Sequence, residues 1–206
     1  MRISKLLLLA ATTAALVTAC GGDDVTTGNE GEVITTITLT FTPTGGGPPF
    51  TAVWDDPDGD GGAAPTIDTI AVGAGAAYRM TVTFQNRLVD PPEDITTEVR
   101  DEGVQHQLFF TGTAVDGPAS DHPGAALAQA YADADANGLP LGLANDLTVA
   151  PAAGGDLTVT LRHLPPVNGT AVKTADLAAT VKASGVDALP GQSDAHVTFP
   201  VAVAVP

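Results

Sequence analysis

Apolar and polar residues alternate with a period of two along most of the chain after residue 32. The clearest case is residues 33–42, where Ile37, Leu39 and Phe41 fall on one face and threonines fill most of the other. Alternation of this kind, carried by β-branched residues, predicts a half-buried strand. The same pattern predicts strands over residues 50–54, 66–72, 77–85, 105–111, 147–150, 156–164 and 196–205.

Two further segments carry a mixed pattern. Residues 125–135 are alanine-rich, which favours a helix by propensity, yet Leu127, Gln129 and Tyr131 alternate with alanines and favour a strand. Residues 174–183 fit either a short helix or an edge strand. Many short strands separated by Gly, Pro and Asp clusters predict an all-β fold, a sandwich of two antiparallel sheets of the Ig-like or jelly-roll kind.

The first residues form a different pattern. A short basic start is followed by an uncharged apolar run over residues 6–17, which is shorter than the roughly 20 residues of a membrane-spanning helix and suits a secretory signal peptide. The sequence Val17-Thr18-Ala19-Cys20 resembles the lipobox of bacterial lipoproteins. The resemblance implies cleavage before Cys20 and a covalent lipid (diacylglycerol on the thiol, acyl on the amine). The alternative is an ordinary secretory signal with a coincidental cysteine.

The chain therefore divides into a signal peptide (1–19), a lipidated N-terminus with a flexible tether (20–32) and one β-sandwich domain (33–206). The tether has almost no apolar residues. Its Asp23-Asp24 pair resembles an acidic export signal of some Gram-negative lipoproteins, and a plain solvated linker is the alternative. We expect a membrane-anchored lipoprotein of the outer membrane, facing either the periplasm or the cell surface.

Charge and cysteine content narrow the possible partners. Removal of the signal peptide leaves six basic against 24 acidic residues, a formal charge of −18. So acidic a chain repels nucleic acid and anionic headgroups, so the expected contact with the bilayer is the lipid alone. Cys20 is the only cysteine, so the domain has neither an internal disulfide nor thiol chemistry.

An acidic run directly follows the predicted strand that ends at Trp54. It places Asp56, Asp58 and Asp60 on alternate residues ahead of a glycine. Calcium takes about six to eight oxygen ligands, and alternate carboxylates of a tight loop can converge on one ion. The twelfth position is not the glutamate of an EF-hand, but Asp68 could close the site. We predict a calcium loop here.

A weaker copy of this run supplies Asp133, Asp135 and Asn137 after another predicted strand. Its lower formal charge predicts a lower affinity for Ca²⁺. For both runs the alternative is a Gly/Asp turn whose side chains cap the local backbone.

None of the four histidines pairs with another at a metal-binding spacing. Strict alternation places His106 on one face with Leu108 and Phe110, which favours a strand-rim histidine with a satisfied hydrogen bond over a ligand or general base. His163 and His196 could meet across neighbouring strands.

Motifs for catalysis are sparse. Ser120-Asp121-His122 is contiguous, whereas triad members meet in space, so a loop is the favoured interpretation. The acidic cluster over residues 90–102 favours a solvated face over paired catalytic carboxylates. The sequence contains no nucleophile elbow, phosphate loop or dinucleotide fingerprint. We therefore expect a protein that is not an enzyme.

Several stretches together, ITLTFTP, AVWDDPDGDGG, QHQLFF and DADANGLPLGL, are similar to those of a family of small bacterial lipoproteins without an established function. Some members carry the label "type 1 periplasmic binding fold", a two-lobed α/β architecture that these residues do not support. The expectation is a non-enzymatic, calcium-stabilised lipoprotein that binds an envelope protein or a glycan, or has a structural role. A carbohydrate-binding or accessory module of an uptake system, and a carboxylate-dependent hydrolase, are the alternatives.

Overall fold

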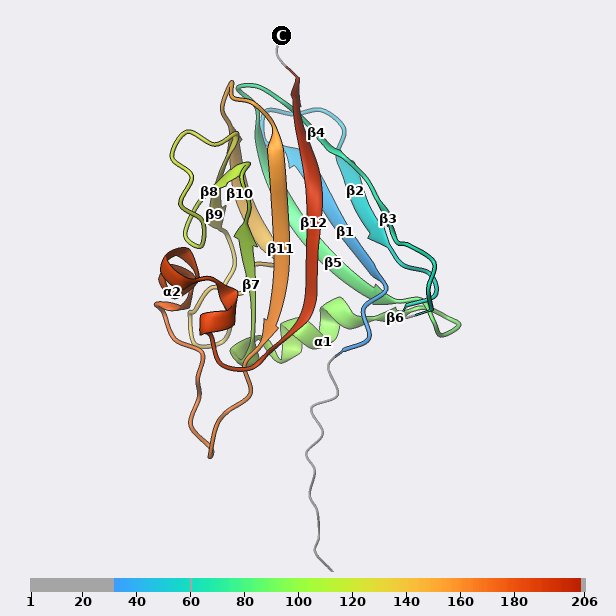
Figure 1. The fold of residues 1–206 in the computed structure, drawn as a ribbon, viewed down its shortest axis with the longest axis vertical. Helices are drawn as coiled ribbons and strands as arrows, with labels where there is room; N and C mark the ends of the chain where they lie inside the picture. Colours follow the sequence, from blue (N-terminus) through green and yellow to red (C-terminus); the bar gives the residue numbers. More distant parts are fainter. Residues whose placement is uncertain (1–31, 60, 205–206) are drawn as a thin grey trace, which may run out of the picture. The chain divides into compact units, whose positions relative to one another are not determined.

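The computed structural model describes residues 32–59 and 61–204 (Figure 1). The predicted signal peptide, Cys20 and the tether up to residue 31 lie outside the described residues, and so does Asp60. Within the described ranges no helix is long and apolar enough to cross a membrane.

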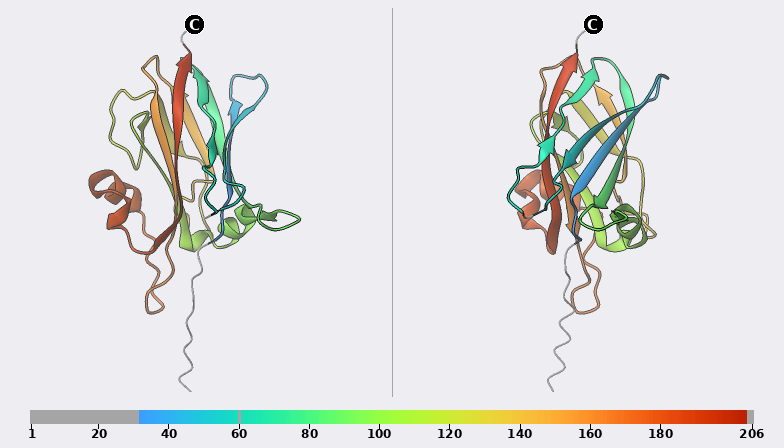
Figure 2. Two further views of the ribbon diagram at one scale, coloured as in Figure 1. Left: turned by 45° about the vertical axis from the view of Figure 1, so that its right-hand side comes forward. Right: turned by 90° about the vertical axis from the view of Figure 1, so that its right-hand side faces the viewer.

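Two sheets build the domain, and the views in Figure 2 show them as two layers. The larger has the order β3-β2-β1-β5-β10-β9-β8, with β6 paired to β5, and the smaller has the order β4-β12-β11-β7. The strands of the larger sheet are β1 (Thr36–Pro43), β2 (Phe50–Asp55), β3 (Thr66–Ile67), β5 (Ala77–Asn86), β6 (Glu93–Asp94), β8 (Val115–Asp116), β9 (Leu127–Tyr131) and β10 (Ala144–Val149). Those of the smaller sheet are β4 (Ile70–Gly73), β7 (His106–Thr111), β11 (Gly155–His163) and β12 (Gln192–Ala204).

Nearly all strand pairs are antiparallel, and only β12–β4 and β8–β9 run parallel among the described residues. The predicted all-β sandwich is thus confirmed. Burial alternates along β5, where every second residue from Tyr78 to Phe84 packs inward, as the period of a half-buried strand requires. The core lies between the sheets and is formed chiefly by Ile37, Leu39, Phe41, Met80, Val82, Phe84, Leu108, Phe110, Leu157, Val159, Leu161 and Phe199.

Strands β7 and β11 are buried on both faces, because the helix α2 (Leu177–Ser184) covers the outer face of the smaller sheet. Phe109 of β7 packs there against Leu177 and Val181. Of the two structures left open for residues 174–183, the helix is the one that forms. A short 3₁₀ turn, η2 (Val186–Ala188), leads from it toward β12.

Residues 66–72 were predicted as one strand but form two, in different sheets. The chain leaves the larger sheet at Asp68, whose backbone N–H and carboxylate both pair with the backbone of Val53. After this anchor it crosses to the smaller sheet and pairs with β12 as β4. Residues 125–135, by contrast, form a strand in their centre, as predicted.

The acidic stretch after β5 contains a helix that alternation did not predict, α1 (Ile95–Asp101), followed by the 3₁₀ turn η1 (Gly103–Gln105). Asp94 caps its N-terminus by accepting a hydrogen bond from the Thr96 N–H at 3.0 Å. Ile95 and Val99 are buried, one turn apart, while the acidic side chains remain exposed. With only two apolar positions, this helix has too short a pattern to stand out in the sequence.

Candidate metal centre

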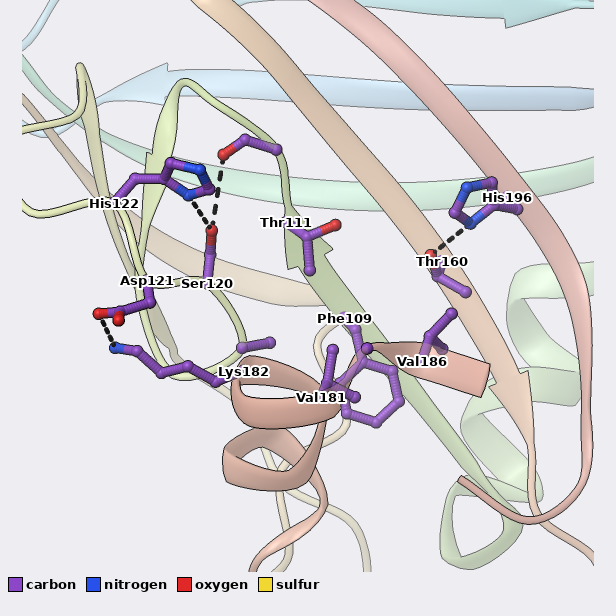
Figure 3. A pocket seen from close by; sticks show the side chains of 13 residues that line it. Phe109, Thr111, Ser120, Asp121, His122, Thr160, Val181, Lys182, Val186 and His196 are labelled. Carbon is purple, nitrogen blue, oxygen red and sulfur yellow. Dashed lines mark hydrogen bonds and ion pairs between the residues drawn. The ribbon is translucent and has the colours of Figure 1, made fainter. Parts of the chain in front are cut away.

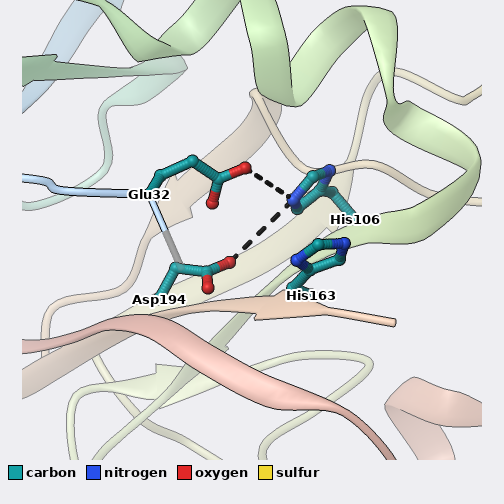
Figure 4. Close-up of side chains that lie close together, drawn as sticks. All are labelled: Glu32, His106, His163 and Asp194. Atoms are coloured by element: carbon teal, nitrogen blue, oxygen red, sulfur yellow. Dashed lines mark ion pairs between the residues drawn. The ribbon is translucent and has the colours of Figure 1, made fainter. Parts of the chain in front are cut away.

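Four side chains converge at one end of the sandwich interior: Glu32, His106, His163 and Asp194 (Figure 4). One ligating atom from each lies within 4.8 Å of the others. The side chains of His106, Asp194 and Glu32 are 0%, 1% and 8% exposed. They form the only such group of metal-ligating residues within the described part of the chain.

The two histidines meet because of strand register. His106 begins β7 and His163 ends β11, and antiparallel pairing puts them directly opposite each other. Their rings stack with centroids 4.5 Å apart. His106 shares its face with Leu108, as alternation predicted, but it is fully buried and does not lie at a solvent rim.

His163 and His196, which could have met across neighbouring strands, do not. His163 lies opposite Gln192 on β12, while His196 lies opposite Thr160 and bonds to its hydroxyl at 2.9 Å. On β11, the partner of His196 is Thr160, which lies three residues before His163. Because this separation is odd, the two histidines are on opposite faces of the sheet.

The orientation of the His106 ring is fixed by the backbone. Its Nδ1 lies 3.2 Å from the carbonyl oxygen of Glu102, and a carbonyl only accepts, so Nδ1 carries a proton. The other nitrogen, Nε2, points into the cluster, 3.1 Å from Oε1 of Glu32 and 3.9 Å from Oδ2 of Asp194. A ring held this way through one nitrogen is the usual arrangement of a metal-ligating histidine.

Asp194 reaches the cluster because β12 contains a bulge. Leu161 pairs with Ala195, but the next residue, Arg162, pairs with Ser193, so Asp194 is the extra residue. A bulge redirects the side chain of the inserted residue. Both Asp194 and Ala195 can then face inward, which strict alternation forbids.

Glu32 lies in the segment just before β1, which belongs to the larger sheet. The N–H of Thr35 donates to the carbonyl of Gln85 at 2.9 Å and fixes this segment beside β5. Sequence patterns placed Glu32 in the tether because its neighbours are polar. No local signal distinguishes it, since its partners are far along the chain.

The ionisation of the two carboxylates, Glu32 and Asp194, is linked, because both lie in one buried site beside His106. Burial and the negative charge of Glu32 raise the pKa of Asp194 to about 7. Burial alone would also raise the pKa of Glu32, but hydrogen bonding and attraction to His106 outweigh it and lower that pKa. The pKa of His106 is raised because attraction to Glu32 outweighs the opposing effect of burial. Burial and the charge of His106 lower the pKa of His163.

The contacts within the cluster are ion pairs of poor hydrogen-bond geometry: His106 Nε2 lies 3.1 Å from Glu32 Oε1 and 3.9 Å from Asp194 Oδ2. The second carboxylate oxygen of Glu32, Oε2, is buried and makes no hydrogen bond with a described residue. Most buried polar atoms in proteins are satisfied, so this oxygen needs an explanation. A cation bound in the cluster would neutralise the carboxylates and give this oxygen a partner.

A groove of about 680 Å³ lies beside Glu32 and Asp194. Trp54, Asp56 and Asp58 also line it. It opens to solvent where Asp58 is exposed. The buried cluster is therefore connected to the surface on this side.

The first predicted calcium loop lies along this groove. The carboxylate of Asp58 accepts the N–H of Ala63 at 3.1 Å. That of Asp68 accepts the N–H of Val53 at 3.0 Å, on the edge of β2. These are backbone-capping contacts of the turn interpretation. Asp60 lies outside the described residues, and calcium binding at this loop stays a prediction.

In the second loop the carboxylates are engaged locally. Asp133 accepts the N–H groups of Gly142 and Ala144 at 2.7 and 3.0 Å. Asp135 accepts that of Asn137 at 2.8 Å, and its Oδ2 lies 2.8 Å from Nζ of buried Lys173. The side chain of Asn137 is exposed. A calcium ion here would have to displace an ammonium group, so the prediction gains no support from this geometry.

A pocket of about 310 Å³ lies between α2 and the smaller sheet (Figure 3). Ser120 donates its hydroxyl proton to the carbonyl of Val115 at 2.7 Å. In its 3.1 Å contact with Ser120, Nδ1 of His122 must therefore be the donor. This is the reverse of a nucleophile activated by a base.

The six acidic residues between 90 and 102 are all exposed, around β6 and α1. This is the solvated face that the sequence favoured. Comparisons with protein-family models, with curated proteins and with solved structures found no match to this chain.

Proposed function

We propose that the chain is a lipid-anchored protein of the cell envelope whose β-sandwich binds a divalent transition-metal ion at Glu32, His106, His163 and Asp194. The observation that carries this proposal is the convergence of four ligating atoms within 4.8 Å of one another in a buried site, where Glu32 Oε2 makes no hydrogen bond with a described residue. Proteins rarely leave such atoms unsatisfied without a ligand or a functional reason.

The donor set favours one class of metal. Imidazole nitrogen suits zinc, copper, nickel and iron, whereas calcium and magnesium prefer oxygen ligands alone. Two histidines with two carboxylates form a mixed set of the first kind. At bond lengths of about 2.0–2.2 Å, the ligating atoms of a tetrahedral site lie roughly 3.5 Å apart, so binding would contract the widest separations here, which stay within 4.8 Å.

The same geometry supports a binding or structural role over catalysis. Four protein ligands fill a tetrahedral site, whereas a catalytic zinc site keeps one position for water or substrate. The side chains are buried between the sheets, whereas the carboxylates around α1 are exposed. The lipid expected on Cys20 would hold this site at the envelope, with the bilayer as its partner and no role for nucleic acid.

Metal titration tests the proposal. The purified protein, first treated with a chelator, is titrated by calorimetry with Zn²⁺, Cu²⁺ and Ca²⁺. We expect one equivalent of Zn²⁺ or Cu²⁺ to bind, and the variants Glu32→Gln and His163→Ala to bind at least tenfold more weakly. Matched controls are Glu93→Gln and His122→Ala, which alter exposed residues and should bind as the wild type does. Equal affinities in all four variants would refute the site.

The carbohydrate-binding alternative keeps one supporting observation, since Trp54 lines the groove. Tyr78 is buried, and the hydroxyl of half-buried Tyr131 is bound to the carbonyl of Leu108. Among the tyrosines and the tryptophan, Trp54 is thus best placed to stack on a sugar, because it is half-buried and lines the groove. A glycan screen in which Trp54→Ala abolishes binding would favour this function.

A further inference from the structure

Hairpin pairing places the first acidic loop next to the metal-binding segment. β1 and β2 are antiparallel, with Thr36 opposite Asp55. The N–H of Asp56 donates to the carbonyl of Thr35 at 2.8 Å. The loop that follows β2 therefore begins beside Thr35. Thr35 is only three residues after Glu32, although Asp56 and Glu32 are far apart in sequence.

The groove joins this loop to the buried cluster. Glu32 and Asp194 line it, whereas His106 and His163 do not. An ion that enters from the groove thus meets the two carboxylates before the two imidazoles. Asp58 lines the same groove and is exposed, and Asp56, which also lines it, is half-buried.

The groove carries charge of one sign. Its lining includes four acidic residues, and neither a lysine nor an arginine is among the described residues that line it. A cleft with charges of one sign concentrates field lines and raises the association rate of an oppositely charged ligand. Charges at the edge of such a path change the association rate more than the dissociation rate.

We propose that this groove is the access route of the divalent cation, and that Asp56 and Asp58 steer the ion to the buried site without ligating it there. This inference rests on the proposed metal-binding function and adds its kinetics. It gives the acidic run after β2 a role in attracting a cation that binds elsewhere. The competing interpretation, in which the loop holds its own ion, makes a different prediction for stoichiometry.

Trp54 provides the signal for the test. It is the only tryptophan of the chain and lines the groove, so Cu²⁺ arriving at the site should quench its fluorescence. Stopped-flow mixing of the chelator-treated protein with Cu²⁺ gives the association rate, and competition with excess chelator gives the dissociation rate. The variants are Asp58→Asn and the double variant Asp56→Asn/Asp58→Asn. Asp187→Asn, which removes the same charge from an exposed residue outside the groove, is the control.

At low ionic strength we expect the association rate to fall about threefold in Asp58→Asn and about tenfold in the double variant. Both differences should nearly vanish in about 0.5 M salt, where screening shortens the range of the charges. The dissociation rate and the stoichiometry of one ion should not change. Asparagine can still accept the N–H of Ala63, so the loop of the single variant should keep its structure.

Three results would overturn the inference. One is an Asp58→Asn rate equal to that of the Asp187→Asn control at low salt. Another is faster dissociation with unchanged association, which would make Asp58 a ligand. The third is a loss of one of two bound ions, which would make the loop a separate site. Failure of the proposed function is distinguishable, because His163→Ala would then show the same quenching as the wild type.

Discussion

At the scale of single residues, the domain uses buried charge in two different ways. Lys173 and Asp135 are paired, with 1% and 0% of their side chains exposed, and the ammonium also donates to the carbonyl of Gly103 at 2.8 Å. Glu32 and Asp194, in contrast, are two carboxylates sharing one imidazole. The first arrangement is electrically complete, whereas the second has an excess negative charge whenever Asp194 is ionised, which is why the pKa of Asp194 is raised to about 7.

The Lys173–Asp135 pair gives a prediction for stability. Lys173→Met keeps the apolar stem but leaves Asp135 buried without its counter-charge. We expect a loss of about 3 kcal/mol in the free energy of unfolding, near the low end for a broken buried pair, because two backbone N–H groups still bind the carboxylate. Urea unfolding at neutral pH measures it.

Lys182→Met is the matched control. Its ammonium lies 3.6 and 4.0 Å from Asp121 and Asp116 at the surface, so the variant should lose less than 1 kcal/mol. Equal losses in the two variants would mean that Lys173 contributes only through packing.

At the scale of elements, α1 depends on its cap more than on its length. The helix is seven residues long, and isolated helices of that length are not stable in water. Asp94 accepts hydrogen bonds from the N–H of Thr96 and the hydroxyl of Thr97. Thr96 in turn binds the backbone of Phe84 and fastens the helix to β5.

Replacing the cap predicts a measurable loss. Asp94→Ala should lower the free energy of unfolding by about 1 kcal/mol. The hydrogen bonds from Thr97 and Thr96 lower the pKa of Asp94, so the cap is fully effective above the ordinary carboxyl pKa and is lost as pH falls through the lowered value. Denaturation of both proteins at neutral and strongly acidic pH should show the difference narrowing in acid.

The control is Asp101→Ala, which removes the same charge at the helix's other end, where acid is unfavourable. It should not destabilise the protein. If it costs as much as Asp94→Ala, net charge explains the loss and capping does not.

The strands were predictable from alternation, but the site was not. Period two reveals which residues of β7 and β11 face inward, yet register alone brings His106 to His163. Asp194 violates the alternation through a bulge, and Glu32 lies where the sequence shows a polar tether. Each of these depends on pairing between distant segments, which a local pattern does not contain.

At the scale of the whole molecule, the strong negative charge and the expected lipid act together. Without the predicted signal peptide, the chain has a formal charge of −18 and so no electrostatic attraction to anionic headgroups. Membrane attachment should therefore depend on Cys20 alone. Several acyl chains make such an anchor durable, since each buried CH₂ contributes about 0.8 kcal/mol.

Fractionation of cells checks this dependence. Cys20→Ser should move the protein from the membrane pellet to the soluble fraction almost completely. A fraction that stays in the pellet after a high-salt wash would show a second attachment. The variant should still bind the metal, because its ligands lie in the domain.

The position of β1 has a mechanical consequence. Any force on the N-terminal end enters the folded domain through Glu32 and then β1, which lies inside its sheet between β2 and β5. To pull β1 out, its backbone hydrogen bonds to both β2 and β5 must break. An edge strand, in contrast, could be peeled away from one neighbour. An ion bound by Glu32 would add a clamp ahead of these bonds. Tension on the predicted tether would then act first on the metal site, which would link Glu32 to the smaller sheet. Only after that would it reach the first backbone hydrogen bonds of β1.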